Sequence, residues 1–416
     1  MAFSNLETQV VILAGGEGTR LWPLTDRRNK PAVPFGGRFR LIDIPLSNAI
    51  NSHMKSIFVS TQGKDYSFGE HVKHGWDIPE LREDEFTTLI SPQDPGGKFN
   101  GDADSVRQII DYISRSYITY SERQASRKLP DNHITIVVPG DGVVKMDYRK
   151  LANFLAENPD ADAAVAYLQS ELINAGNLGS LLIGSDNIVE EIKEKDANTP
   201  FRVKDDKHFP ASIGIYAFRT GKLIESLRET KGNSFSPHIL EYFLDNKKLL
   251  GYNFSQHNKI PGYIFDQKTG KEVFTEQSPD SDYWEDVGLI ETYFAVHMDL
   301  VGAEPRFNIH APVYPEHYKD IRGWWPIRTP VSNSVGPGKT VLGGEISDAI
   351  MDSGVILSQT KSHKVVLSPH VYVESSTLDE AIVYSGAIIR NSKLHRTIVD
   401  KNAIVEGLTI GYEEPH

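Results

Sequence analysis

A spacing of six residues recurs in the C-terminal part of the chain, and it constrains the fold more than any other feature. Small or β-branched residues follow one another at this spacing in the series Val365, Val371, Thr377, Val383 and Ile389. This pattern is typical of a hexapeptide parallel β-helix, in which each short strand directs one side chain into a prism. A flat β-sandwich would alternate every two residues instead. We therefore expect a left-handed parallel β-helix.

Two further series at the same spacing support this prediction. They are Ile382, Ile388 and Leu394, then Ile398, Ile404 and Ile410. The shift of register after Leu394 predicts one irregular coil. Residues 301–330 are rich in Pro and aromatic residues and are expected to connect a first domain, residues 1–300, to the β-helix at residues 331–416.

The first domain shows the alternation of strands and helices that indicates an α/β fold. Short apolar runs predict strands at 9–14, 56–61, 133–141, 163–168 and 211–218, and helical spacing predicts helices at 105–113, 148–157 and 220–229. Such alternation favours a Rossmann-like, mostly parallel sheet covered by helices on both faces. Ligands bind at the carboxyl edge of such sheets, where Gly15–Arg20 and Gly140-Asp141 are expected to lie.

Composition excludes several classes of function. The chain has no cysteine, which rules out disulfides, zinc–thiolate sites, iron–sulfur clusters and a cysteine nucleophile. A net charge of −12 argues against nucleic-acid binding. No apolar run reaches the ~18 residues of a membrane span, and the N-terminus lacks signal-peptide features, so a cytoplasmic protein without membrane contact is expected.

Positive charge is nevertheless concentrated near the N-terminus. Between residues 20 and 40 only Asp26 opposes six basic residues, which are Arg20, Arg27, Arg28, Lys30, Arg38 and Arg40. A basic segment on an acidic protein indicates a small anionic ligand, although a solvated surface loop would show the same composition.

A glycine-rich turn precedes this basic segment, in the sequence LAGGEGTRL. Glycines between a strand and a helix let backbone N–H groups approach phosphate oxygens. The turn is no Rossmann fingerprint, because Leu21 stands where that motif needs its third glycine. It is no P-loop either, because no Gly-Lys-Ser/Thr follows.

The string AGGEGTRLWPLT…KPAVPFGGRFRLIDIPLSNAINS resembles the opening of the nucleotidyl transferases that act on sugar 1-phosphates. More narrowly, it is similar to the glucose-1-phosphate adenylyltransferase family of glycogen and starch synthesis, and the resemblance covers nearly the whole chain. It implies ATP and glucose 1-phosphate as substrates, with Arg20 and Lys30 as catalytic residues on the triphosphate. It also implies nucleotide contacts from Ala14, Gly15, Gly16, Gly18, Thr19, Gln62, Gly101 and Asp104.

Two aspartates are candidates for binding Mg²⁺. Asp141 ends the strand ITIVVPGD, and a carboxylate at a strand tip beside a phosphate site suits a cation that takes oxygen ligands. The resemblance adds Asp286, in the sequence YWEDVG, as the second ligand. Either residue alone would more often be a turn former.

The resemblance also implies a sugar-phosphate site. The expected contacts are Glu194, Lys195, Ser212, Tyr216 and Trp284. The match around Glu194-Lys195 is loose, and the run EEIKEKD would otherwise be read as a solvated charged segment. Asp104 is expected to open the helix that begins near Ser105 as an N-cap-like residue.

Three positions depart from the family pattern. Gly142 replaces a histidine after the metal aspartate, Asp102 replaces a threonine near the nucleotide, and Ser234 replaces an aspartate that accepts sugar hydroxyls. These departures leave open a different nucleotide or sugar, or a weakly catalytic regulatory subunit. A hexapeptide acyltransferase is the third alternative, with His363, His370 and His395 as candidate bases.

Enzymes of the family are usually homotetramers regulated by small anions that bind between their domains. The resemblance therefore implies a homotetramer and an anionic effector. Arg27 and Arg40 are the expected effector contacts, and Arg28 and Arg38 are additional candidates.

Overall fold

A computed structural model describes residues 7–16, 18–54, 56–62, 66–76, 86–91, 98–109, 132–196, 198, 201, 207–245, 248–266, 268–309 and 337–411. The chain divides into two compact units whose segments alternate along the sequence. Unit 1 comprises Met1–Gly16, Pro45–Gly140 and Met146–Ile260. Unit 2 comprises Glu17–Ile44, Asp141–Lys145 and Pro261–His416. Of the expected linker, residues 310–330 lie outside the described residues.

Unit 1 is built on a nine-stranded sheet in which β6, β1, β4 and β5 run parallel as neighbours. Strand β11 joins this group antiparallel and pairs in turn with β8 and β9. The strands are β1 (Thr8–Leu13), β4 (Ser56–Ser60), β5 (Phe86–Ile90), β6 (Ile134–Pro139), β8 (Ala163–Glu171), β9 (Ser180–Ile183), β10 (Val189–Lys193), β11 (His208–Arg219) and β12 (Leu249–Asn253). All five predicted strands are confirmed.

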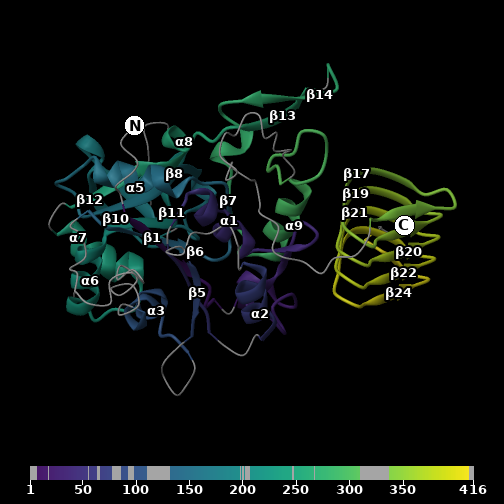
Figure 1. Cartoon of the computed structure of the whole chain (residues 1–416), viewed down its shortest axis with the longest axis horizontal. Helices are drawn as coiled ribbons and strands as arrows, with labels where there is room; N and C mark the ends of the chain where they lie inside the picture. The colour runs from purple at the N-terminus through teal and green to yellow at the C-terminus, as the bar shows by residue number, and fades with distance from the viewer. Residues whose placement is uncertain are drawn as a thin grey trace. The chain divides into compact units, whose positions relative to one another are not determined.

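Helices cover both faces of this sheet, with α5 and α8 on one side and α3 and α6 on the other (Figure 1). They are α1 (Asp43–Asn51), α2 (Tyr66–Gly75), α3 (Asp102–Gln108), α5 (Tyr148–Ala156), α6 (Thr220–Glu229), α7 (Glu241–Leu244) and α8 (Phe254–His257), with a π-helix η5 (Phe235–Leu240) and short 3-10 turns η3 (Leu172–Asn174) and η4 (Ser185–Asn187). The helices predicted at 148–157 and 220–229 are confirmed. The one predicted from Ser105 begins at Asp102, and its later residues lie outside the described part.

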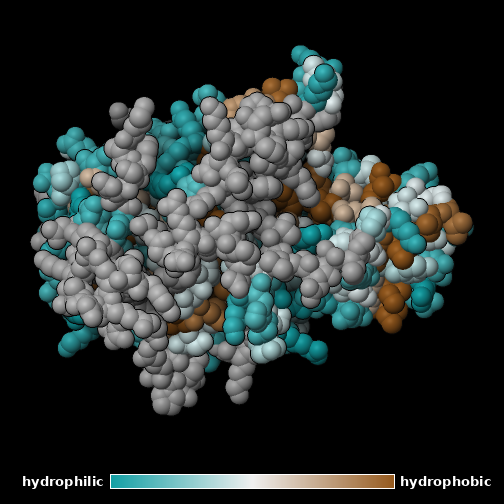
Figure 2. Space-filling model, in the orientation of Figure 1, coloured by the Kyte–Doolittle hydropathy of each residue, from teal (hydrophilic) through white to brown (hydrophobic). Residues whose placement is uncertain are grey.

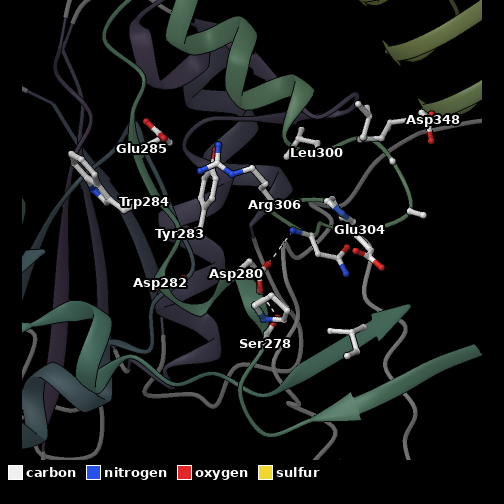
Figure 3. A pocket seen from close by; sticks show the side chains of 18 of the residues that line it. Ser278, Asp280, Asp282, Tyr283, Trp284, Glu285, Leu300, Glu304, Arg306 and Asp348 are labelled. Atoms are coloured by element: carbon white, nitrogen blue, oxygen red, sulfur yellow. Dashed lines mark hydrogen bonds between the residues drawn. The ribbon is translucent and has the colours of Figure 1, made fainter. Parts of the chain in front are cut away.

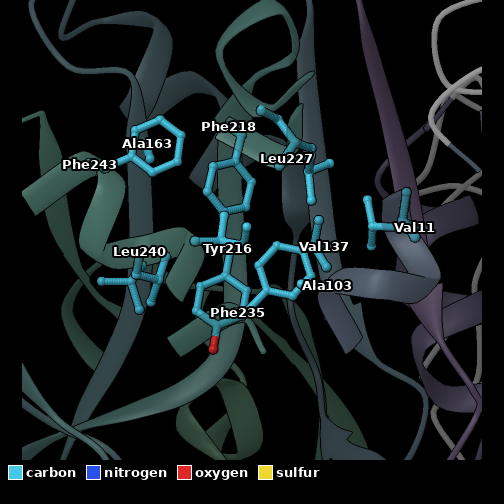
Figure 4. Packing of buried hydrophobic residues seen from close by; sticks show 14 of the residues in the cluster. Val11, Ala103, Val137, Ala163, Tyr216, Phe218, Leu227, Phe235, Leu240 and Phe243 are labelled. Carbon is cyan, nitrogen blue, oxygen red and sulfur yellow. The ribbon is translucent and has the colours of Figure 1, made fainter. Parts of the chain in front are cut away.

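The core between the sheet and the α3–α6 side is rich in aromatic rings. The rings of Tyr216 and Phe235 are stacked, and the ring of Phe218 packs against both at a tilt. Val137 and Leu227 belong to the same cluster (Figure 4). Alternate residues of β11 therefore direct one face of the strand into this core, as the period of two in a strand requires.

Unit 2 begins with short elements and one helix. They are η1 (Thr19–Leu21), η2 (Lys30–Ala32), β2 (Pro34–Phe35), β3 (Phe39–Arg40), β7 (Gly142–Val144), β13 (Gly262–Asp266), β14 (Lys271–Thr275), η6 (Pro279–Asp282), β15 (Trp284–Asp286) and α9 (Ile290–Met298). Strands β7 and β15 come from distant parts of the sequence and pair antiparallel.

The rest of unit 2 is the expected left-handed parallel β-helix. Its strands form two parallel ladders. One contains β16 (Lys339–Val341), β18 (Ile356–Ser358), β20 (Tyr372–Glu374), β22 (Ile388–Arg390) and β24 (Ile404–Glu406), and the other contains β17 (Glu345–Met351), β19 (Lys361–Leu367), β21 (Thr377–Val383), β23 (Lys393–Val399) and β25 (Thr409–Ile410).

The period of the coil differs from the one predicted. Stacked partners such as His363 and Asp379 are 16 residues apart, so a coil is shorter than three hexapeptides. Each coil turns at corners held by residues in the left-handed region, for example Lys364, Glu380 and Arg396 at one corner. Counting in sixes therefore mixes inward and outward positions. Val365, Val371, Val383, Ile389 and Leu394 are in the interior, whereas Ile404 and Ile410 are exposed.

One outer face of the β-helix is apolar where α9 packs on β19 and β21. Val366 and Ile382 are each 1% exposed and share a cluster with Tyr293 and Val296 of α9. Other apolar side chains stay on the surface of the β-helix, among them Leu342, Ile404 and Leu408 (Figure 2). No helix in the part of the chain that the structure describes is long and apolar enough to cross a membrane.

Candidate active site

The antiparallel pairing of β7 and β15 brings two candidate metal aspartates together. Asp141 directly precedes β7, and Gly142 is the partner of Asp286 in the ladder. Residues separated by more than a hundred positions in the sequence are thus placed side by side by a three-residue ribbon. The glycine that replaces the expected histidine occupies the position opposite Asp286.

Lys30 lies between these two carboxylates. Its Nζ is 2.7 Å from Oδ2 of Asp141 and 3.4 Å from Oδ1 of Asp286, and its side chain is only 9% exposed. Burial by itself would lower the pKa of Lys30, but the two carboxylates outweigh it and raise the pKa. Lys30 is therefore a fixed positive charge held against both aspartates.

The glycine-rich turn contributes Gly18 and Arg20 to the same group. Gly18 adopts φ +68°, and a Cβ there would lie 2.7 Å from Cβ of Lys30, so the backbone approach needs glycine. Arg20 is exposed on η1. A Cβ on Gly288 would lie 3.2 Å from Nη2 of Arg20 and 3.4 Å from Oδ2 of Asp286. The absence of a side chain at Gly288 therefore leaves room for Arg20 beside Asp286.

The donor set fits a magnesium ion. Two carboxylates converge on one cation, the ammonium group of Lys30, which shows that the spot attracts positive charge. No group of three or more His, Cys, Asp or Glu side chains that would hold a metal occurs among the described residues. Two aspartates with open positions suit Mg²⁺, because it keeps waters and takes its other ligands from substrate phosphates.

In unit 1, the first strands bring together several residues expected to contact the nucleotide. Gln62 donates from Nε2 to the carbonyl of Gly15 and accepts at Oε1 from the N–H of Phe99, at 2.7 Å. The N–H of Ala14 is bonded to the carbonyl of Ser60, at 2.8 Å. Gln62 therefore links the glycine-rich turn to the segment that leads into α3. Gly16, the last residue of this segment of unit 1, is exposed, and so is Thr19 in unit 2.

The start of α3 differs from the prediction in detail. Gly101, at φ +103°, is the N-cap, and Asp104 is the third helical residue. Oδ2 of Asp104 accepts the N–H of Asn100 at 2.8 Å, which satisfies the backbone just before the helix. Asp104 thus stabilises the helix start from inside the first turn, in the manner of a capping box, and is not the cap itself.

The expected sugar contacts Glu194, Ser212 and Tyr216 also belong to unit 1. A Cβ on Gly179 would lie 3.1 Å from Oε2 of Glu194 and 3.9 Å from Cβ of Ser212, so both side chains border the same glycine. Tyr216 is buried, and desolvation raises the pKa of its hydroxyl. Lys195 is exposed, at φ +50°, with Nζ 3.6 Å from Oε1 of Glu194. Trp284 belongs to unit 2.

The arginines expected to bind an effector have different surroundings. Arg27 is 89% exposed and lies 3.7 Å from Asp26. Arg28 pairs with Asp400 at 3.2 Å, and Arg38 makes a forked contact with Asp352. The Arg40 side chain is half-buried. Two of the four arginines are therefore already engaged by carboxylates of the β-helix.

A pocket of about 1030 Å³ is lined in part by residues of the segment 278–285, which precedes Asp286 (Figure 3). Arg306 lies over the ring of Tyr283, 5.7 Å from its centroid. Asp280, at the opposite wall, accepts hydrogen bonds from Asn308 and Ser278. The described lining does not include Lys30, Asp141 or Asp286, so this pocket is distinct from the group around Lys30.

The histidines of the β-helix are tied to neighbouring carboxylates. Nδ1 of His363 and Nδ1 of His395 each lie 2.9 Å from Asp379, on successive coils. His370 adopts φ +63° at a corner of the coil. Stacking along the ladder is enough to account for the first two contacts.

Comparison with known proteins agrees with this geometry. A family model described as nucleotidyl transferase matches residues 9–302, and one described as GlmU-like, C-terminal hexapeptide, matches residues 336–416. Proteins named glucose-1-phosphate adenylyltransferase are similar over most of the chain. The one from Corynebacterium kroppenstedtii is 32% identical, covering 88% of this chain and 80% of its own. The one from Thermodesulfovibrio yellowstonii is 32% identical, and the match covers 84% of this chain and 80% of that protein. The one from Rhodopirellula baltica is 34% identical, and the match covers 85% of this chain and 72% of that protein.

Proposed function

Because the chain belongs to the nucleotidyl transferase family and is an enzyme of that kind, we propose that it is a glucose-1-phosphate adenylyltransferase. The reaction converts ATP and glucose 1-phosphate to ADP-glucose and pyrophosphate, for glycogen or starch synthesis. The names of the similar proteins support this substrate pair. The observation that carries the proposal is the position of Lys30 between Asp141 and Asp286, beside Arg20.

In the proposed reaction, a phosphate oxygen of the sugar 1-phosphate attacks the α-phosphorus of ATP in line with the departing pyrophosphate. No covalent bond to the protein is needed. Arg20 and Lys30 bind the triphosphate and offset the negative charge that builds up on the leaving group. Lys30 is suited to this role because its raised pKa keeps it charged across the physiological range.

Asp141 and Asp286 would hold Mg²⁺, which supplies charge neutralisation at the phosphates when bound. Within the chain, the two carboxylates orient Lys30 by direct ion pairs. In unit 1, Gln62, Gly15, Gly101 and Asp104 are assigned to the nucleotide, and Glu194, Lys195, Ser212 and Tyr216 to the sugar phosphate. Trp284 is assigned to the sugar as well.

A substrate panel tests this proposal directly. Pyrophosphate release is measured with ATP, UTP, dTTP and GTP, each against glucose, galactose, mannose and N-acetylglucosamine 1-phosphates. The proposal expects the highest kcat/KM for ATP with glucose 1-phosphate. A different best pair would make the protein another sugar-nucleotide pyrophosphorylase. No turnover of any pair would favour a regulatory subunit, although Arg20, Lys30, Asp141 and Asp286 are all present.

We also propose that the protein is a homotetramer that responds to an anionic effector, and that it works in the cytoplasm. Apolar side chains exposed on the last coil, Ile404, Leu408 and Ile410, support a contact between subunits. Arg27 and Arg40 are assigned to the effector from the resemblance, and the 89% exposed side chain of Arg27 supports this assignment for that residue. Light scattering of the purified protein tests the subunit number.

A further inference from the structure

We propose that Asp102 is the residue that selects the sugar, accepting a hydroxyl of the hexose 1-phosphate with its free carboxylate oxygen. This inference rests on the proposed function and names a contact that the family pattern does not contain, since threonine is expected at this position. All residues involved belong to unit 1.

One oxygen of Asp102 is fixed by the backbone. Oδ1 accepts the N–H of Ala103 at 3.0 Å and the N–H of Phe235 at 3.1 Å. Two donors from different segments hold the carboxylate in one orientation. A side chain preorganised in this way loses little freedom when it binds a ligand.

The other oxygen is available to a ligand. Oδ2 receives no hydrogen bond from another residue in the described part of the chain, and Asp102 is accessible to solvent on one side. Asp102 is exposed, and partial desolvation nevertheless raises the pKa of its carboxyl, with the charge of Glu194 adding to the rise.

Asp102 lies near two of the expected sugar contacts, Tyr216 and Glu194. Its Oδ1 accepts the N–H of Phe235, which packs against Tyr216. The charges of Asp102 and Glu194 both raise the pKa of the Tyr216 hydroxyl, and the charge of Glu194 raises the pKa of Asp102. The rings of Tyr216 and Phe235 are stacked, with centroids 5.7 Å apart and planes 12° from parallel, which fixes Phe235 and hence its N–H (Figure 4). Asp102 and Glu194 therefore offer two carboxylates to one polyhydroxyl ligand.

This placement also accounts for the departure at Ser234. Ser234 directly precedes Phe235, whose N–H binds Asp102, so a carboxylate on the facing segment stands next to the position where the family pattern has its own. The acidic group absent from position 234 is thus supplied from position 102. A change of side chain on one segment is matched by a change on its neighbour.

A purely structural role for Asp102 is less economical. The two segments are already joined by the N–H of Ala103 on the carbonyl of Asn233, at 3.0 Å, and by the close approach of Gly101 to the same carbonyl. Arg107 adds hydrogen bonds to the carbonyls of Thr230 and Gly232, at 3.0 and 2.9 Å. Asparagine at this first helical position would keep the acceptor for both backbone N–H groups, and the charge adds only the favourable interaction of an acid in the first turn with the helix dipole. The hydrogen bonds of the fold therefore do not require a charge at position 102.

The test uses Asp102→Asn, which keeps Oδ1 for the two backbone donors and removes the charge. KM and kcat are measured on the full chain with ATP and glucose 1-phosphate, and with its 2-, 3-, 4- and 6-deoxy analogues. In the wild type, the analogue that lacks the contacted hydroxyl should show kcat/KM lowered by ~10–100-fold. Asp102→Asn should lower kcat/KM for glucose 1-phosphate by a similar factor, leave the KM for ATP unchanged, and no longer distinguish that one analogue from the parent sugar.

Three further variants complete the test. Glu191→Gln neutralises an exposed carboxylate on β10 and should leave all constants unchanged. Asp102→Thr should weaken sugar binding, and Asp102→Thr combined with Ser234→Asp should restore it, which a merely structural role would not predict. Unchanged selectivity among the sugars in Asp102→Asn, or an equal loss for ATP and sugar, overturns the inference. Failure of the wild type to turn over any sugar 1-phosphate would instead overturn the proposed function.

Discussion

Lys30 and Asp141 form an ion pair of 2.7 Å although they lie on segments with no sequence proximity, and Asp286 completes the group from a third segment. The three charges sum to −1, so the group binds one more positive charge readily, and the ribbon of β7 and β15 fixes its geometry.

Asp141→Asn is expected to lower kcat by roughly 10²–10³-fold, as loss of one electrostatic contact in an active site typically does. The protein should stay folded, because the amide retains a hydrogen bond to Lys30. Steady-state pyrophosphate release and thermal unfolding check the two statements. Asp26→Asn, which neutralises a 61% exposed carboxylate, is the matched control. Near-normal kcat in Asp141→Asn would contradict the assignment.

Gly18→Ala is expected to reduce both stability and activity. Alanine at φ +68° is strained by about 1–3 kcal/mol, and its Cβ would displace Lys30. Gly16→Ala is the comparison, because a Cβ there meets nothing within 4 Å. Chemical denaturation and kcat should separate the two variants, and equal behaviour would show that the turn does not position Lys30.

Lys145→Met should destabilise unit 2 by about 3–5 kcal/mol, because it leaves Asp280 charged and buried without its cation. The two side chains are 3% and 2% exposed and form a direct ion pair. Adding Asp280→Asn removes the charge but keeps acceptors for Ser278 and Asn308, and should recover most of the loss. Urea unfolding of the single and double variants measures it. An additive double variant would mean that the pair contributes nothing specific.

His297 should make stability depend on pH between about 4 and 6.5. Burial lowers its pKa to about 4, because the ring is enclosed and Nε2 accepts the N–H of Gly36, a bond that a proton on Nε2 would break. The unfolded chain binds the proton first, so stability is highest above pH 6.5 and falls by about 3 kcal/mol as pH drops to 4. The unfolding free energy of His297→Gln, measured across this range, should lack that part of the slope. An identical slope would place the titration elsewhere.

Replacing Arg27 and Arg40 by alanine should spare basal activity and flatten the response to an anionic effector. The physical reason is that an exposed guanidinium such as that of Arg27 can bind an anion, whereas Arg28 and Arg38 are engaged by carboxylates. Activation and inhibition curves with fructose 1,6-bisphosphate, 3-phosphoglycerate and AMP measure the response. Arg396→Ala, another exposed arginine of unit 2, serves as the control. Unchanged curves in the double variant would refute the assignment.

Much of the fold could be predicted because it depends on local patterns. Strand β1, before Gly15, and strand β6, before Asp141, are short apolar runs. They are neighbours in the sheet and pair in parallel. The six-residue spacing likewise predicts the β-helix. It does not predict the 16-residue coil, because the corners depend on residues with positive φ such as Glu380 and Arg396, and these have no hydrophobic pattern.

The candidate site was also predicted only in part. Lys30, Asp141 and Asp286 were identified from motifs, but their convergence depends on the pairing of two three-residue strands, too short to carry a periodic signal. The Lys145–Asp280 pair was missed because a lone lysine after a strand resembles a surface residue. The contact of Asp102 could not be predicted for a different reason. Its carboxylate accepts the backbone N–H of Phe235, and every residue except proline has such a group, so the sequence does not single it out.

The alternation of the two units along the chain has a consequence for any attempt to divide the protein. The chain passes from one unit to the other five times, and the shortest segment is Asp141–Lys145 of unit 2. No single cut yields either unit as a complete polypeptide, so a library of truncations made at one site should contain no independently folding half. Exchange of modules with a relative by a single recombination event would likewise mix segments of both units.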